Sequence, residues 1–187
     1  ANIWVKDLLD LDEPEQQVTF EKFRLLNNAS WHPTRNLLIA KKHFTTSRSL
    51  GTGEIWMYHG FLDGSLNREK MSGAVVVERP SKNYQKELGE PVFSHDGSSV
   101  FYTQNATPGD MFVYHEDSND EVMVIKSFDL QTAKSKVVAG GPGGAVRPTP
   151  SPDGRKLAYV KRVRAQSRLF VQDLDSQKEI MLSDELD

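Results

Sequence analysis

Five histidines are the residues of this chain best suited to acid–base or metal chemistry, and their spacing argues against both. Closely spaced histidines begin many metal sites, as His-x-His on a strand in one type of hydrolytic centre and as His-Glu-x-x-His on a zinc-binding helix. Neither pattern occurs, the chain has no cysteine to supply thiolate ligands, and the five histidines are His32, His43, His59, His95 and His115. We therefore expect no metal, no cofactor and no catalytic residue here, and the absence of a Gly-x-Ser-x-Gly elbow also argues against a nucleophilic serine.

Three other polar stretches have simpler interpretations than the chemistry they suggest. The glycine run 140–144 lacks the Lys-Ser/Thr of a phosphate loop, so it is interpreted as a connector whose glycines allow close backbone approach. The acidic run 117–121 lacks the glycine and distal glutamate of a calcium loop, which favours a solvated loop tip. The basic stretch 161–168 has no interleaved aromatic residues and the net charge is −3, so we expect no nucleic-acid partner.

The elements that would have to position any site are short strands that repeat along the chain. Residues 92–102 and 149–159 share a strand, a Ser-x-Asp-Gly turn and a second strand ending in aromatic residues, and residues 30–40 form a weaker copy. The turn residues suit a type I turn that closes a hairpin. In the weaker copy Thr34 and Arg35 replace Asp-Gly, so any left-handed backbone is expected on Arg35 or Asn36.

A second unit follows each hairpin, with a strand that ends near Asp-Leu and then a short β-branched strand. Four antiparallel strands repeating along a chain are typical of a β-propeller blade. The sequence therefore predicts an all-β partial propeller of about three and a half blades. Its expected parts are the second half of a blade at 1–26 and complete blades at 27–88, 89–146 and 147–187. Large apolar residues of these strands, including Trp31 and Trp4, are expected to pack in the core.

The hairpins and Asp-Leu strands resemble the TolB-like, WD-repeat-like propeller repeats of secreted and periplasmic bacterial proteins. A narrower resemblance rests on residues 48–56 and 143–154, which are similar to the propeller region that precedes a metal-dependent amidohydrolase barrel in large bacterial enzymes. The resemblance implies a periplasmic or secreted location. It also implies a ring of about six or seven blades, of which this chain supplies about half.

A binding site, if the chain has one, is expected where the loops between the second and third strands meet the connectors between blades. Those segments are 44–53, 107–119, 80–90 and 140–147. The candidate residues there are Arg48, His43, Tyr84 and Arg147, whose donors suit an acidic ligand, a peptide carboxylate or the surface of a fused domain. The alternative is that Arg48 and Arg147 only hold their loops in place.

The function expected from the resemblance is that of a non-catalytic propeller portion of a larger hydrolase, acting as a scaffold or as a binding face for substrate or protein. A stand-alone TolB-like protein-binding propeller of a cell-envelope complex is the second possibility, and the propeller cap of a serine peptidase is the third. The chain begins within a strand and reads as a fragment or mature product. We expect a fused or associated catalytic domain or protein partner, self-association of the isolated chain, and no membrane span, since no apolar run approaches 20 residues.

Overall fold

Fourteen β-strands make up the regular structure of the chain in a computed structural model, which describes residues 1–22, 24–43, 53–59, 73–77, 88–107 and 122–183. No helix occurs among these residues. The strands are β1 Trp4–Val5, β2 Gln16–Gln17, β3 Leu25–Trp31, β4 Leu37–His43, β5 Gly53–His59, β6 Gly73–Val77, β7 Leu88–Phe93, β8 Ser99–Asn105, β9 Met123–Asp129, β10 Lys134–Ala139, β11 Val146–Pro150, β12 Lys156–Val163, β13 Gln166–Asp173 and β14 Glu179–Met181.

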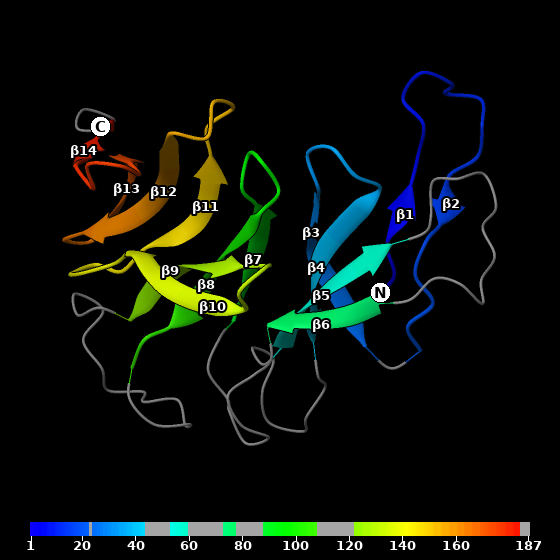
Figure 1. Ribbon diagram of the computed structural model, residues 1–187, viewed down its shortest axis with the longest axis horizontal. Helices are drawn as coiled ribbons and strands as arrows, with labels where there is room; N and C mark the ends of the chain where they lie inside the picture. The colour runs from blue at the N-terminus through cyan, green and yellow to red at the C-terminus, as the bar shows by residue number, and fades with distance from the viewer. Residues whose placement is uncertain (23, 44–52, 60–72, 78–87, 108–121, 184–187) are drawn as a thin grey trace.

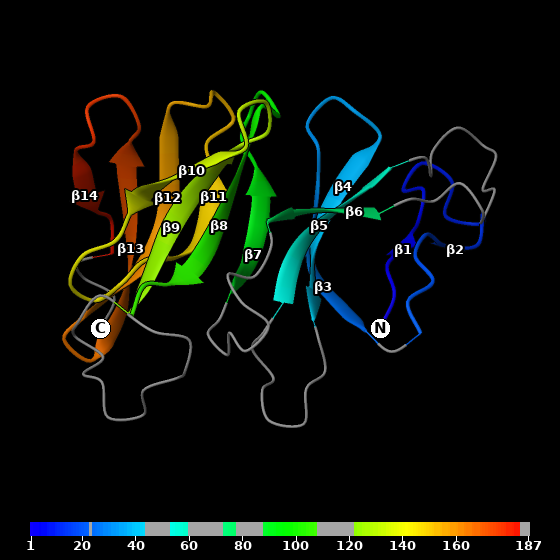
Figure 2. The same ribbon diagram turned by 60° about the horizontal axis from the view of Figure 1, so that its bottom comes forward.

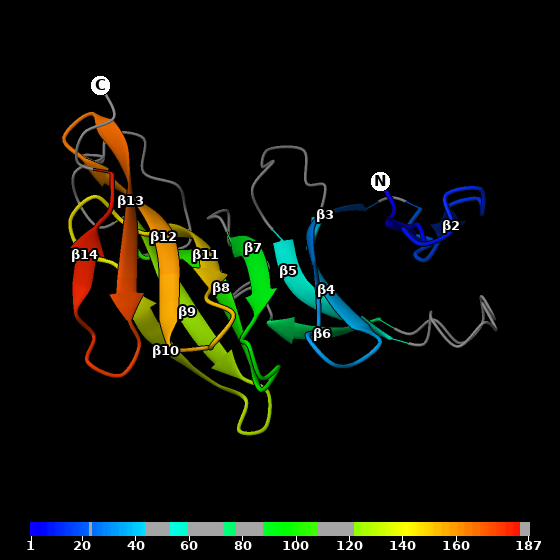
Figure 3. The ribbon, with the colours of Figure 1, turned by 90° about the horizontal axis from the view of Figure 1, so that it is seen from above.

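The strands form three four-stranded antiparallel sheets, β3–β6, β7–β10 and β11–β14, and one two-stranded sheet, β1–β2. Within each sheet the strands lie in chain order, as the blades of a propeller do. Figures 1 and 2 show the sheets side by side in sequence, with β1–β2 at one end and β11–β14 at the other, and Figure 3 shows the same order from above. The predicted all-β partial propeller of about three and a half blades is confirmed.

Two of the three predicted hairpin turns have the expected hydrogen bonds. The Gly97 amide donates to the Ser94 carbonyl at 2.9 Å, and the Gly154 amide donates to the Ser151 carbonyl at 2.9 Å. Both glycines have φ of +72°, a conformation that other residues adopt at a cost. The Asp96 carboxylate accepts from the Ser94 and Ser98 hydroxyls, and these bonds lower its pKa to about 2. The turn chemistry read from the sequence therefore holds in these two blades.

The first hairpin turns by a different route, with no left-handed residue at Arg35 or Asn36. Neither residue is among those with positive φ. Instead the His32 ring accepts hydrogen bonds at Nδ1 from the Thr34 and Arg35 amides, both at 3.1 Å. The His32 side chain, at the start of the turn, thus accepts from backbone amides to which an Asp side chain would otherwise be the acceptor. The backbone therefore needs no left-handed residue.

His32 also joins the first blade to the second. His32 is 6 % exposed, and its ring packs edge-on against Phe93, with 4.8 Å between the ring centroids. A Cβ added at Gly97 would lie 2.1 Å from Nε2 of this ring, so the glycine is required for the contact. Burial lowers the pKa of His32 and the Arg35 charge lowers it further, while the Gly97 backbone and Asp96 act in the opposite direction.

We expect acid to destabilise the chain through His32. Because the folded pKa lies below the ordinary 6.5, the contribution of neutral His32 is complete above pH 6.5 and is lost as the pH falls from 6.5 through the lower folded pKa. Urea unfolding between about pH 7 and pH 5 should show a decline that shrinks in His32→Asn, since Asn keeps an acceptor for the turn. The matched control is His95→Asn, which removes an exposed histidine. Equal declines in all three proteins would contradict this assignment.

The core lies between neighbouring blades. One cluster joins Ile39 and Ile55 of the first blade to Phe93, Val100 and Tyr102 of the second, and another joins Phe101 and Ile125 to Leu157, Tyr159 and Phe170 of the third. Two tryptophans predicted to be core are exposed instead: Trp31 by 47 % and Trp4 by 54 %. Trp4 lies on β1 of the two-stranded sheet, and Trp31 lies on β3, which lines a groove together with β1.

Candidate functional site

Two of the four candidate residues, His43 and Arg147, lie in the described part of the chain, and Arg48 and Tyr84 lie outside it. His43 ends β4, and its Nε2 is 3.1 Å from Oδ1 of Asn27 on β3. Arg147 is the second residue of β11. Each of these two residues lies at the end of its sheet where the first, innermost strand begins. The two residues belong to different blades, His43 to the first and Arg147 to the third.

The innermost strand of every blade carries the same irregularity, which lies next to these residues. In the first blade the pairs Asn27–Lys41 and Ser30–Ile39 advance three residues on β3 but two on β4. The same step occurs between Gly89–Thr103 and Val92–Phe101, and between Val146–Val160 and Thr149–Ala158. Each first strand therefore contains a one-residue β-bulge, a feature that redirects a side chain out of the sheet pattern.

A non-glycine residue with left-handed backbone occupies each bulge. These residues are Asn28 with φ of 51°, Glu90 with φ of 52° and Arg147 with φ of 58°. A left-handed conformation costs a side-chain-bearing residue about 1–2 kcal/mol, and such residues often mark functional sites. Three blades thus hold three different polar side chains in one unusual conformation at one structural position.

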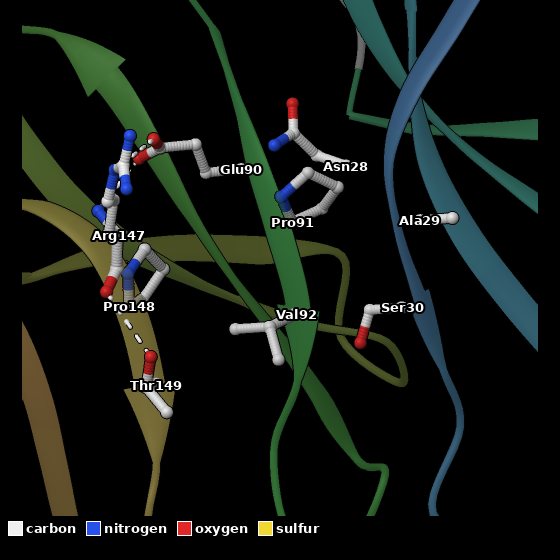
Figure 4. A pocket seen from close by; sticks show the side chains of 9 residues that line it. All are labelled: Asn28, Ala29, Ser30, Glu90, Pro91, Val92, Arg147, Pro148 and Thr149. Carbon is white, nitrogen blue, oxygen red and sulfur yellow. Dashed lines mark hydrogen bonds and ion pairs between the residues drawn. The ribbon is translucent and has the colours of Figure 1, made fainter.

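The three bulges line a common groove of about 450 Å³ (Figure 4). Each blade contributes three consecutive residues to it: Asn28, Ala29, Ser30; Glu90, Pro91, Val92; and Arg147, Pro148, Thr149. Pro91 and Pro148 have no amide hydrogen, so these inner edges are poorly suited to pairing with another strand. The groove instead offers side chains to a ligand at the inner edge of three blades.

The charges of the groove are linked across two blades. The backbone amide of Arg147 donates to Oε2 of Glu90 at 2.7 Å, and the Arg147 Nε lies 3.7 Å from Oε1 of the same carboxylate. The Glu90 side chain is 27 % exposed and the Arg147 side chain is 78 % exposed. Glu90 therefore ties the second blade to the third, while most of the guanidinium faces solvent.

The groove has an exposed cation whose neighbouring carboxylate is already engaged. The Arg147 guanidinium has further N–H groups to offer, and the carboxylate among the described lining residues, Glu90, accepts from the Arg147 backbone amide. An exposed guanidinium beside neutral donors suits a carboxylate ligand, which arginine binds through two parallel hydrogen bonds. Within the described ranges no three acidic or histidine side chains come together in a way that could hold a metal ion.

Asn28 and Glu90 were not singled out by sequence reasoning, which named Arg147 alone of the three. A signal exists in the repeats: each bulge residue stands four positions before the first residue of the hairpin turn, which is His32, Ser94 or Ser151. Aligning the three hairpins in this way brings Asn28, Glu90 and Arg147 into register. The sequence does not reveal the bulge itself, because the pairing of β-strands determines it.

Comparison with known proteins identifies the fold. No family model matches the sequence, and no curated protein matches it. Solved structures do: TolB from Acinetobacter baumannii superposes with a TM-score of 0.68 at 16 % identity, covering 97 % of this chain and 37 % of that one. A putative TolB from Agrobacterium tumefaciens gives 0.60 at 13 % identity, with 89 % and 51 % covered.

An oligogalacturonate lyase in complex with manganese is also similar, with a TM-score of 0.61 at 14 % identity, covering 97 % of this chain and 47 % of that one. At these identities the similarity establishes a TolB-like propeller fold and does not by itself assign a role. This chain spans between 37 % and 51 % of the length of the three proteins. No helix in the described segments has the length and apolar character needed to cross a membrane.

Proposed function

We propose that this chain is a non-catalytic propeller portion of a larger bacterial hydrolase and that its inner groove binds a carboxylate-bearing segment of a protein. The observation that carries the proposal is the exposed Arg147 side chain in a groove where Glu90, the carboxylate among the described lining residues, is already engaged. The bound segment belongs to a fused or associated catalytic domain, or to a separate protein partner. The proposed location is periplasmic or secreted.

The hydrolase in this proposal is a metal-dependent amidohydrolase, for which residues 48–56 and 143–154 are the supporting stretches. Residues 27–88, 89–146 and 147–187 are its proposed blades, with 1–26 as the second half of another. The TolB structures favour a second candidate, a stand-alone protein-binding propeller of a cell-envelope complex. Both candidates assign the same binding role to the groove.

The proposal predicts that Arg147→Gly loses binding of acidic peptide without losing stability. Glycine keeps the backbone amide that donates to Glu90 and adopts a φ of 58° without strain, so the variant removes the guanidinium alone. With a fluorescein-labelled tetraglutamate peptide as probe, fluorescence anisotropy should show saturable binding to the parent chain. Affinity should fall about tenfold in Arg147→Gly, the size expected for a lost charged hydrogen-bond pair.

Arg164→Gly is the matched control. Arg164 is also exposed and left-handed, with φ of 55°, but it does not line the groove. Both variants therefore lose one positive charge and one strained residue. If they weaken the peptide equally, the effect is general electrostatics and the groove is not the site; a labelled tetraglutamine peptide that binds as well as tetraglutamate would also contradict the proposal.

A further inference from the structure

A pocket of about 260 Å³ lies between the second and third blades, toward the outer strand β10. The second blade contributes Phe101, Ser127 and residues 136–138, and the third contributes Leu174 and Gln177 from the turn after β13. The two sheets are neighbours in Figures 2 and 3. This pocket is a separate site, because it shares no lining residue with the inner groove.

The second blade is polar at two positions of this pocket where the other blades are apolar. Phe101 pairs with Ser127, and Ser127 pairs with Lys136, so the three residues form a row across one face of the sheet. Counted from the first residue of each hairpin turn, the corresponding row is Ile39, Met57 and Ala74 in the first blade and Ala158, Val171 and Ile180 in the third.

The exchange of methionine for serine in this row accounts for the pocket. Between the first and second blades, Met57 packs in one cluster with Leu130, the residue that follows β9. Leu174 follows β13 in the same way, so it is the counterpart of Leu130 in the third blade. Ser127 stands where Met57 would reach toward this leucine, and its side chain is too short to fill the space.

Hydrogen bonds and packing fix the walls of the pocket. Gln172 of β13 donates from Nε2 to the Val138 carbonyl at 3.2 Å, which ties the third blade to the second. The Gln177 side chain accepts from Gln172 at 2.8 Å and donates to the Leu174 carbonyl at 2.7 Å. Val138 and Leu174 also pack against the core cluster that contains Phe101. The pocket is therefore formed before any ligand enters, as small-molecule sites usually are.

Two donors in the pocket lack partners. Ser127 is 8 % exposed, and its hydroxyl forms no hydrogen bond with any residue in the described ranges. Lys136 is exposed and forms no salt bridge with the described residues, and Asp129, the carboxylate that its charge influences, is held by Thr132. No acidic side chain is among the described residues that line the pocket. A buried hydroxyl beside an ammonium group suits an anionic acceptor.

We propose that this pocket binds a small organic acid with an apolar body. The carboxylate accepts hydrogen bonds from the Lys136 ammonium and the Ser127 hydroxyl. The apolar part of the ligand packs against Phe101, Val138 and Leu174. Pockets for drug-sized ligands have volumes of roughly 300–1,000 Å³, so a smaller molecule is the ligand here. The site acts independently of the inner groove and of the protein partner proposed for it.

Titration of the isotope-labelled, intact 187-residue chain with phenylacetate tests the proposal by nuclear magnetic resonance. Saturable shifts are expected for the backbone amides of Ser127, Val138 and Gln177. Phenylacetamide has the same shape without the charge and should bind about tenfold more weakly, the size of one lost charged hydrogen bond. Equal binding of the acid and the amide contradicts the carboxylate site, and shifts confined to the inner groove around Thr149 overturn the assignment to this pocket.

Three variants locate the ligand. Ser127→Met restores the residue type of the first blade, so it should fill the pocket, keep the urea midpoint at or above that of the parent chain and abolish the phenylacetate shifts. Lys136→Gln should weaken phenylacetate binding about tenfold. Lys134→Gln is the matched control, because it removes the same charge from the same strand but does not line the pocket.

Three results overturn the proposal. One is the absence of saturable shifts in the parent chain. Another is unchanged affinity for phenylacetate in a folded Ser127→Met chain, since the filled pocket has no room for the ligand. The third is an equal loss in Lys136→Gln and Lys134→Gln, which would make the effect general electrostatics.

Discussion

Replacing Gly143 with alanine should be among the most destabilising substitutions in this chain, lowering the free energy of unfolding by about 2–3 kcal/mol. Gly143 belongs to the connector between β10 and β11 and has φ of +86°. A Cβ at this position would lie 1.9 Å from the carbonyl oxygen of Arg162, far inside van der Waals contact. The obstruction is backbone, so no side-chain rotation relieves it.

Two physical costs combine in that variant. The left-handed conformation alone costs alanine about 1–2 kcal/mol. Moving the connector away from β12 also breaks the hydrogen bond from the Arg162 amide to the Gly143 carbonyl, 3.1 Å long, which contributes about 1 kcal/mol. Urea unfolding followed by tryptophan fluorescence measures the total.

Gly141→Ala separates the two costs. Gly141 has nearly the same φ, +82°, but a Cβ there would meet nothing within 4 Å. This variant should lose only the conformational part, about 1–2 kcal/mol. Equal losses in the two variants would mean that the connector does not lie close to β12. The packing that the structure gives the third blade would then be contradicted as well.

The second large effect is expected at Ile125. This residue is fully buried between the second and third blades, in one cluster with Phe101, Leu157 and Phe170. Truncation to alanine removes buried methylene and methyl groups and leaves a cavity, and such substitutions cost about 2–5 kcal/mol. We expect Ile125→Ala to lower the free energy of unfolding by an amount in that range, measured by urea unfolding at neutral pH.

Leu169→Ala provides the control for Ile125→Ala, because it tests the same position in the next blade. Leu169 pairs with Val160 on β12 as Ile125 pairs with Thr103 on β8, yet Leu169 is 41 % exposed. Its truncation should cost less than about 1 kcal/mol, since the solvent already reaches much of the side chain. Comparable losses at the two positions would show that the third blade has a covered outer face, contrary to the structure.

The repeat structure could be determined from local sequence alone. Asp-Gly turns, alternating apolar residues and the Asp-Leu strands are properties of a few neighbouring residues, so the sequence predicts four-stranded units and the all-β propeller without any knowledge of their packing. The glycine connector at 140–144 belongs to the same class. The glycines were expected to allow close backbone approach, and the structure shows such an approach between Gly143 and the Arg162 carbonyl of β12.

Whether an apolar side chain of the first blade is buried could not be predicted from local sequence. Trp31 and Phe93 have equivalent places in their hairpins, but one is exposed and the other buried. The difference depends on which strand of the preceding sheet covers each residue, and that strand is distant in sequence. Local pattern specifies which face of a strand is apolar; only the neighbouring blade specifies whether that face is covered.

The candidate site shows the same division. Sequence reasoning placed Arg147 on a loop-bearing end of the molecule and proposed an acidic ligand for it, from residue type alone. Tertiary structure decided that Arg147 shares a groove with Asn28 and Glu90, because three separate blades bring their bulged inner strands together. A bulge is a mismatch between two paired strands, and a groove between blades requires their packing, so neither exists in any one stretch of sequence.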